Sequence, residues 1–167
     1  MAEYSSVLLA FGGNEAGAWG EPAAAILRAF GELEQNGVRL GVKSRLIATK
    51  AFGPAPQPDY VNAVASGITA LDAEALLALI KQLEWAAGRR PGPRWGPRPL
   101  DIDILDFGGT ILGWDRPHDP KHPAHLVLPH PELANRDFVL ALLAEVAPDW
   151  RHPVSGLTPR QMLTALK

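Results

Sequence analysis

Six segments that alternate between strand and helix patterns constrain the fold of this 167-residue chain more than any other feature. Short apolar runs with turn residues at their ends predict strands, and apolar residues repeated every three or four positions predict helices. In chain order the segments are a strand at 7–11, a helix at 22–36, strands at 38–49 and 60–69, a helix at 73–87 and a strand at 100–107. This order predicts an α+β, ferredoxin-like βαββαβ sandwich.

Helical additions are expected after the last strand. Residues 113–130 carry four prolines and four of the five histidines, so irregular structure is expected there. Phe138–Val146 has helical periodicity, and Thr158-Pro159 is an N-cap followed by a first-turn proline. Since no linker, internal repeat or low-complexity tract divides the sequence, we expect a single domain over residues 1–167.

The composition excludes several classes of protein. The net charge of −2 gives no overall field that would attract nucleic acid or an anionic membrane, and no apolar run approaches the ~18–20 residues of a membrane helix. With no cysteine, the chain has no disulfide, thiolate nucleophile or cysteine-ligated metal. The N-terminus lacks the pattern of a secretory signal. We therefore expect a cytoplasmic monomer that binds neither nucleic acid nor membrane.

The chemistry is concentrated in the sequence RWGPRPLDIDILDFGG, residues 94–109. In a strand, residues two apart lie on one face, so Asp101 and Asp103 project together with Cβ atoms ~7 Å apart. Two like charges at that distance are unfavourable unless a cation lies between them. Magnesium is usually held by one or two carboxylates and phosphate oxygens. The alternative is a strand whose solvent face simply carries two aspartates.

Four arginines precede this pair, at Arg89, Arg90, Arg94 and Arg98. Guanidinium groups bind phosphate oxygens in a bidentate manner, and the intervening glycines and prolines let the backbone approach a ligand. Trp95 adds a flat face that can cover a planar ring. Arginines for phosphate beside carboxylates for magnesium indicate a nucleotide triphosphate site; the alternative is a solvated basic connector.

Three other motifs carry no function in this interpretation. Asp106-Phe107-Gly108 matches a protein-kinase triplet, but the other kinase motifs are absent. His118, His122 and His125 are separated by prolines, so an exposed histidine segment is favoured over a zinc site. Gly12-Gly13-Asn14 is not a P-loop, since no Gly-Lys-Ser/Thr follows.

Residues 94–109 resemble the signature of the 6-hydroxymethyl-7,8-dihydropterin pyrophosphokinase family, which runs R-W-G-P-R-x-L-D-x-D-I. Further blocks that resemble this family occur in the right order, from about Val7 to Pro148. They are FGGN (11–14), QPDYVNAV (57–64), QLEWAAGR (82–89) and PHPELANRDFVL (129–140). The resemblance implies transfer of pyrophosphate from ATP to the hydroxymethyl group of the pterin, giving AMP and the pterin diphosphate in folate biosynthesis.

The resemblance also implies roles for individual residues. Two Mg²⁺ ions would be held by Asp101 and Asp103, with Arg89, Arg98 and Asp103 as catalytic residues and Asp103 as the best candidate for a general base. The ATP-binding set would be Glu84, Arg89, Arg98, Ile104, His130 and Arg136. The pterin-binding set would be Thr49, Phe52, Tyr60, Asn62, Trp95 and Phe138. Two aromatic planes suit a flat bicyclic ring, and an asparagine amide offers a paired donor and acceptor to its edge.

Two functions from other classes are the alternatives to this one. A ligand-binding regulatory module is common among ferredoxin-like folds, but it would need neither the aspartate pair nor the arginines. An RNA-binding sheet would need stacking aromatics on its strands and a basic surface, and the sequence has neither.

Overall fold

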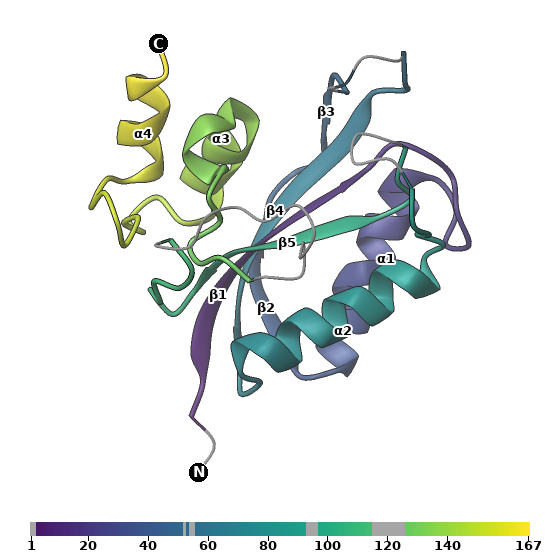
Figure 1. The fold of residues 1–167 in the computed structure, drawn as a ribbon, viewed down its shortest axis with the longest axis horizontal. Coiled ribbons are helices and arrows are strands. Elements are labelled where there is room, and N and C mark those ends of the chain that lie inside the picture. Colours follow the sequence, from purple (N-terminus) through teal and green to yellow (C-terminus); the bar gives the residue numbers. More distant parts are fainter. Residues whose placement is uncertain (1–2, 52, 54–55, 93–96, 115–125) are drawn as a thin grey trace.

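The computed structural model describes residues 3–51, 53, 56–92, 97–114 and 126–167. Within these residues the strands form one antiparallel sheet in the order β2-β4-β1-β5, with β3 also paired to β4 (Figure 1). The strands are β1 (Ser5–Gly13), β2 (Val38–Lys43), β3 (Ile47–Thr49), β4 (Tyr60–Thr69) and β5 (Asp101–Phe107).

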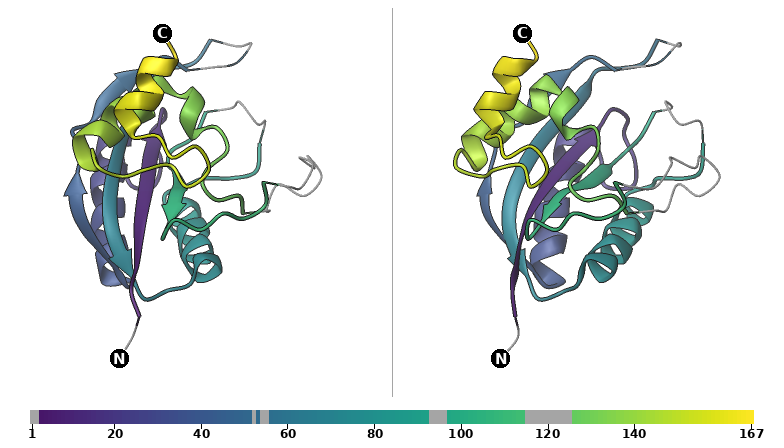
Figure 2. Two further views of the ribbon diagram at one scale, coloured as in Figure 1. Left: turned by 90° about the vertical axis from the view of Figure 1, so that its left-hand side faces the viewer. Right: turned by 60° about the vertical axis from the view of Figure 1, so that its left-hand side comes forward.

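Helices cover both faces of the sheet (Figure 2). One face carries α1 (Pro22–Gln35) and α2 (Ala73–Ala86), and the other carries the 3₁₀ turn η1 (Leu133–Asn135), α3 (Asp137–Val146) and α4 (Pro159–Ala165). The predicted α+β class, the βαββαβ order and the C-terminal helical additions are confirmed.

The helix ends follow the signals in the sequence. Asp72 caps α2 by accepting a hydrogen bond from the Ala75 N–H at 2.7 Å. Gly88 follows the helix with a φ of 114°, a left-handed conformation that glycine adopts without steric cost. At α4, Thr158 and Gln161 form a reciprocal capping box.

The single strand predicted at 38–49 is wrong, since the structure divides it into β2 and β3. Ser44 lies at the break: its backbone N–H donates to the Val64 carbonyl, and its hydroxyl accepts from the Val64 N–H, both at 2.8 Å. The side chain thus takes a hydrogen bond that a backbone carbonyl would otherwise accept, and the pairing register shifts between Leu40 and Lys43. The spacing of apolar residues in the sequence does not indicate that the Ser44 hydroxyl replaces a backbone acceptor.

The core has two parts, one on each face of the sheet. Ile102 and Ile104 of β5 pack toward α1 and α2, as the alternation in the sequence predicts. Leu105 packs toward α3 and α4, as alternation also predicts, whereas Phe107 returns to the face of Ile104 because a bulge opposite Leu8 and Leu9 adds one residue to β5. Because Ile102 and Ile104 bury one face of β5, the side chains of Asp101 and Asp103 lie on the other face.

Among the described residues, none of the helices has the length and apolar character that crossing a membrane requires.

Candidate active site

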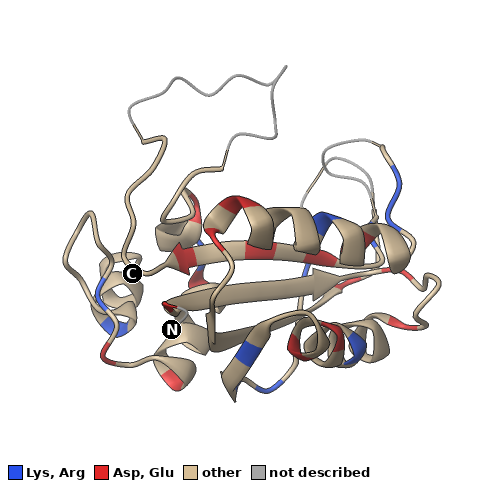
Figure 3. Ribbon diagram, turned by 90° about the horizontal axis from the view of Figure 1, so that it is seen from below, with Lys and Arg blue, Asp and Glu red and all other residues tan. Residues whose placement is uncertain are grey.

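The two aspartates at the start of β5 lie on one face of the sheet. Asp101 pairs with Gly12 of β1 and Asp103 with Ala10, while Ile102 between them pairs with Phe11 in the core. Each aspartate side chain keeps 29% of its surface exposed. Figure 3 shows the acidic positions spaced along β5 beside α2. The expected shared face is therefore present, and it is open enough for a ligand to reach both carboxylates.

Arg89 links the first aspartate to the end of α2. Its Nη1 donates to Asp101 Oδ1 at 2.8 Å and to Glu84 Oε2 at 2.7 Å. Glu84 is buried, and the same oxygen accepts from the Ile102 N–H at 2.8 Å. Burial and the nearby Asp101 charge raise the pKa of Glu84, while Arg89 opposes this shift. Burial alone would lower the pKa of Arg89, but the charges of Asp101 and Glu84 outweigh it.

Glu84 is thus buried, and its place in the ATP-binding set stays a prediction. It also pairs with Lys81, whose Nζ lies 3.6 Å from Glu84 Oε1. Lys81 lies on an exposed face of α2, and its position in the sequence does not indicate this pairing.

Arg98 lies near the same oxygen of Asp101. Its Nη1 lies 3.4 Å from Asp101 Oδ1, so Asp101 is flanked by two guanidinium groups. The Arg98 backbone is held by Asn14, which accepts from the Arg98 N–H at 2.8 Å. Residues 93–96, including Arg94 and Trp95, lie outside the described part of the chain.

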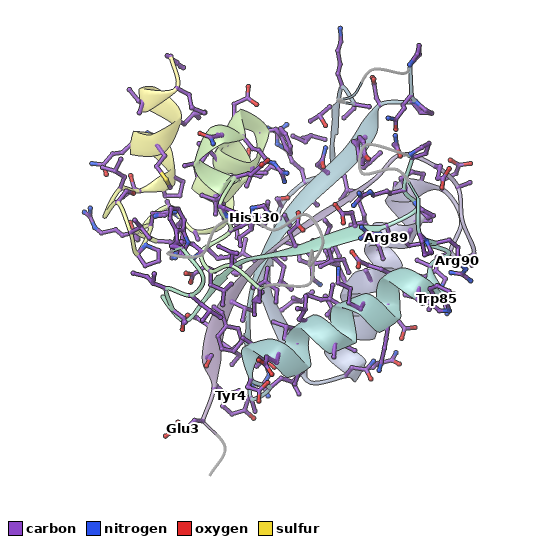
Figure 4. All side chains as sticks on the ribbon, viewed as in Figure 1. Glu3, Tyr4, Trp85, Arg89, Arg90 and His130 are labelled. Carbon is purple, nitrogen blue, oxygen red and sulfur yellow. The ribbon has the colours of Figure 1, made fainter. Side chains whose placement is uncertain are left out.

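Asp103 has a different set of neighbours. Arg136 Nη1 lies 3.6 Å and His130 Nε2 3.9 Å from Asp103 Oδ2, both beyond hydrogen-bond distance. Burial and the charge of Asp101 raise the pKa of Asp103 to about 7. Burial and the charge of Arg136 lower the pKa of His130 to about 4. Figure 4 labels Arg89 beside the end of α2 and His130 beside β5.

Polar groups that could recognise a flat ring lie on β3 and β4. Asn62 Nδ2 donates to Thr49 Oγ1 at 2.5 Å, which fixes the orientation of the amide. Gly12 lies opposite Asn62 in the sheet, and a Cβ there would come within 2.9 Å of Asn62 Oδ1. Burial raises the pKa of Tyr60, and the charges of Arg98 and Asp101 act on its hydroxyl in opposite directions. These residues therefore border the carboxylate face.

The structure does not bring every predicted site residue together. Ile104 is buried between the sheet and the helices α1 and α2, on the face opposite the aspartates. Phe138 is partly buried in the first turn of α3 and packs against the second core. Phe52 and Trp95 lie outside the described residues. Asn14 was missed as a site residue, because nothing in its local sequence indicates its distant partners.

The oxygen donors suit magnesium rather than a softer metal. No group of three or more His, Cys, Asp or Glu in the described part of the chain is arranged to hold a metal ion. Two carboxylates on one open face, with arginines ready for phosphate, match an ion that takes one or two protein ligands and completes its shell with phosphate and water. The residues present therefore fit Mg²⁺ bound together with a nucleotide.

Comparison with known proteins decides the family. A family model described as "7,8-dihydro-6-hydroxymethylpterin-pyrophosphokinase (HPPK)" matches residues 8–148. The chain belongs to this family. The 2-amino-4-hydroxy-6-hydroxymethyldihydropteridine pyrophosphokinase of Pseudomonas aeruginosa is 41% identical over 133 residues, which are 80% of this chain and 75% of that relative.

Two further comparisons agree with the HPPK family. The relative of the same name from Synechocystis is 40% identical over 115 residues, 69% of this chain, and the chain spans 54% of that relative's length. A solved structure titled "Crystal Structure Analysis of the HPPK-DHPS in complex with substrates" has a TM-score of 0.68 at 13% identity. The match covers 98% of this chain and 43% of the solved chain. At 13% identity it supports the fold alone.

Membership of the HPPK family confirms the resemblance inferred from residues 94–109 and the expectation of a pyrophosphokinase of folate biosynthesis. The roles of individual residues stay predictions.

Proposed function

We propose that this chain transfers the β,γ-diphosphate of ATP to the hydroxymethyl group of 6-hydroxymethyl-7,8-dihydropterin. The pterin oxygen attacks the β-phosphorus, the bond from the β-phosphorus to the bridging oxygen of AMP breaks, and the hydroxyl proton is released. The observation that carries this proposal is the pair Asp101 and Asp103 on one open face, with Arg89 and Arg98 on one side and Arg136 on the other.

Asp101 and Asp103 would hold Mg²⁺, which when bound neutralises the phosphate charge. The protein would supply the rest of the positive field. Arg89 is fixed by Glu84, so its guanidinium is oriented before the nucleotide arrives. Arg98 and Arg136 border the two aspartates from different segments, which suits a chain of phosphates lying across both carboxylates. Phosphoryl transfer depends mainly on this kind of positioning and charge stabilisation.

The pterin would bind beside β3 and β4. Asn62 donates to Thr49 with one N–H and keeps a carbonyl oxygen and a second N–H for the ring edge. Tyr60 lies two residues before it on β4, near enough for the charges of Arg98 and Arg89 to act on its hydroxyl. Phe52, Trp95 and Phe138 are the aromatic residues that we expect to cover the ring.

A coupled assay for AMP tests the function. We expect AMP release from ATP only when Mg²⁺ and the hydroxymethyl pterin are both present, and none when either is left out. Asp101→Asn and Asp103→Asn should each abolish most of the turnover, whereas the exposed Asp149→Asn should behave like the wild type. ADP as the product, or AMP release that does not depend on the pterin, would contradict the proposal.

A further inference from the structure

Trp114 holds the peptide group that leads into His130. Its indole Nε1 donates to the Pro129 carbonyl at 3.0 Å. The N–H of the same peptide group, which belongs to His130, donates to the Leu105 carbonyl of β5 at 2.9 Å. A side chain thus holds one end of this planar group, and the edge of the sheet holds the other. Because the plane is rigid, fixing it restricts the direction in which the His130 side chain leaves the backbone.

A backbone bridge holds the same segment one residue earlier. The Leu112 N–H donates to the Leu128 carbonyl at 2.8 Å, and the Leu128 N–H donates to the Leu112 carbonyl at 2.9 Å. Leu128 is buried and belongs to the core cluster that β5 shares with α1 and α2. The bridge therefore anchors the segment on the core and brings the stretch that carries Trp114 alongside Pro129.

The indole of Trp114 is itself held by the C-terminal part of the chain. Its ring lies 5.9 Å from the ring of His152 at an interplanar angle of 81°, an edge-to-face contact. His152 is buried, and its Nδ1 accepts from the N–H groups of Val154 and Ser155. Trp114 keeps 43% of its surface exposed. Hydrophobic burial is therefore a small part of what places this ring, and the hydrogen bond to Pro129 gives it a defined direction.

The His130 ring reaches the carboxylate face (Figure 4). Its Nδ1 accepts from the Glu132 N–H at 3.2 Å, so the proton of the neutral ring is on Nε2. Nε2 lies 3.9 Å from Asp103 Oδ2. The His130 side chain keeps 21% of its surface exposed, so this N–H is open to a ligand. A shift of the peptide group before His130 would move the N–H relative to Asp103.

We propose that Trp114 is a positioning residue whose hydrogen bond to Pro129 fixes His130 for nucleotide binding. This inference rests on the proposed function, in which His130 belongs to the ATP-binding set. A segment that is already ordered costs less to fix when the ligand binds, so the hydrogen bond should raise the affinity for the nucleotide. The pterin is expected beside β3 and β4, so its binding should not depend on Trp114.

A double-mutant cycle on the full chain tests whether Trp114 acts through His130. Calorimetry measures the dissociation constant of a non-hydrolysable ATP analogue with Mg²⁺ in the wild type, Trp114→Phe, His130→Ala and the double variant. Trp114→Phe keeps a ring against His152 and removes the indole N–H. We expect it to raise the dissociation constant at least ~3-fold, as the loss of one hydrogen bond predicts. Once His130 is replaced by alanine, the same substitution should have no further effect.

Steady-state kinetics and a matched control complete the test. In Trp114→Phe the KM for ATP should rise and the KM for the pterin should stay unchanged. Trp85→Phe makes the same substitution at another exposed tryptophan, which stacks on Arg90 at the end of α2, and it should change neither constant. Urea titration of each variant measures its stability. Since the Trp114 ring is partly exposed, we expect Trp114→Phe to fold.

Several results would overturn the inference. They are an unchanged dissociation constant in Trp114→Phe or in His130→Ala, an equal loss in Trp85→Phe, and an equal loss from Trp114→Phe in the His130→Ala background. A rise in the KM for the pterin equal to that for ATP has the same force. All of these leave the proposed function standing, whereas a wild type that does not bind the analogue with Mg²⁺ refutes both.

Discussion

Glu84 Oε2 lies 2.7 Å from Arg89 Nη1, although the Glu84 side chain is only 2% exposed. A buried carboxylate is unfavourable unless it is paired and hydrogen-bonded, and Glu84 Oε2 meets both conditions through Arg89 and the Ile102 N–H. Glu84 Oε1 has no hydrogen-bond partner among the described residues, and the Lys81 ammonium lies 3.6 Å away. The pair fixes the guanidinium against Asp101 before any ligand arrives. We therefore expect Glu84 to act on the site through Arg89, which contacts both Glu84 and Asp101.

Replacing this carboxylate should affect both stability and turnover. Glu84→Gln keeps an oxygen for the Ile102 N–H but removes the charge that holds Arg89. We expect the free energy of unfolding to fall by about 1–3 kcal/mol. We expect kcat to fall about tenfold, a loss of about 1.4 kcal/mol in transition-state stabilisation. Urea titration and steady-state kinetics measure the two effects.

The chain offers a matched control for this change. Glu145 forms an exposed pair with Arg45 at 3.1 Å, and Glu145→Gln should alter stability by less than about 1 kcal/mol without changing kcat. Equal effects of Glu84→Gln and Glu145→Gln would mean that burial of the Glu84–Arg89 pair contributes nothing to stability or turnover.

Substituting the two aspartates should change the stability of the protein in different ways, although both substitutions should reduce turnover. Asp101→Asn and Asp103→Asn should each lower kcat by at least ~10²-fold, since metal neutralisation is worth several kcal/mol. Without metal, Asp101→Asn should lower the Tm, because Asp101 pairs with Arg89 and Arg98. Asp103→Asn should leave the Tm unchanged or raise it, because Asp103 is half-buried beside a like charge, and Arg136 approaches it only to 3.6 Å. Thermal unfolding in EDTA checks this order, and near-normal turnover in both variants would remove the metal site.

The arginines should act mainly on kcat. Arg89→Ala or Arg98→Ala should lower kcat more than it raises the KM for ATP, if these groups stabilise charge that develops on the transferred phosphates. Lysine at either position should rescue only partly, since an ammonium cannot reproduce the guanidinium geometry.

Arg90 is the control for this experiment. Its guanidinium stacks 3.7 Å from the Trp85 ring and donates to the Trp85 and Arg89 carbonyls, so it is engaged at the end of α2 (Figure 4). Arg90→Ala should therefore change kcat little. If Arg89→Ala, Arg98→Ala and Arg90→Ala all change only the KM for ATP, the arginines form a diffuse basic surface and make no defined phosphate contacts.

Local patterns in the sequence were enough for much of the fold and for the carboxylate face. Asp72 and Thr158 are caps with short-range partners, so sequence reasoning found the starts of α2 and α4. The alternation of Asp101, Ile102 and Asp103 likewise determines which side chains share a face. These features depend on neighbours within a few residues.

Other features depend on partners far away in the sequence. The break at Ser44 results from a hydrogen bond to Val64, and the buried Asn14 forms its hydrogen bonds with Gln57 and Arg98. Glu84 fits a helix face by periodicity, and only the folded sheet shows that its carboxylate reaches the Ile102 N–H. The spacing of residues along the chain does not indicate these contacts.

The pterin site should respond to Asn62 without a matching effect on ATP. Asn62→Ala removes the amide that Thr49 orients, so the KM for the pterin should rise about tenfold or more, as expected when a buried hydrogen bond to a ligand is lost. Thr49→Val should have a smaller effect, because the amide stays but loses its fixed orientation. Initial rates with each substrate varied in turn separate the two constants. An equal rise in the KM for ATP would contradict a specific role of Asn62 in pterin binding.

His152 should make stability depend on pH independently of the active site. Its Nδ1 accepts from the N–H groups of Val154 and Ser155, and its ring lies 5.9 Å from the rings of both Trp114 and Trp150. Nε2 is buried and has no hydrogen-bond partner in the part of the chain that the structure describes. Burial accordingly lowers the pKa of His152, so the folded state resists the proton that the unfolded chain takes up below its ordinary pKa of 6.5.

The sign of the effect follows from this difference. As the pH falls from 7 through 6.5, the unfolded state binds a proton at His152 while the folded state does not, so the free energy of unfolding decreases toward the lowered folded pKa. His152→Asn keeps a side-chain acceptor for Val154 and Ser155 but cannot titrate. The other histidines are common to both proteins, so the stability advantage of the wild type over this variant should shrink between pH 7 and pH 5. Urea titrations across that range measure the difference, and parallel curves would show that His152 titrates alike in the folded and unfolded chains.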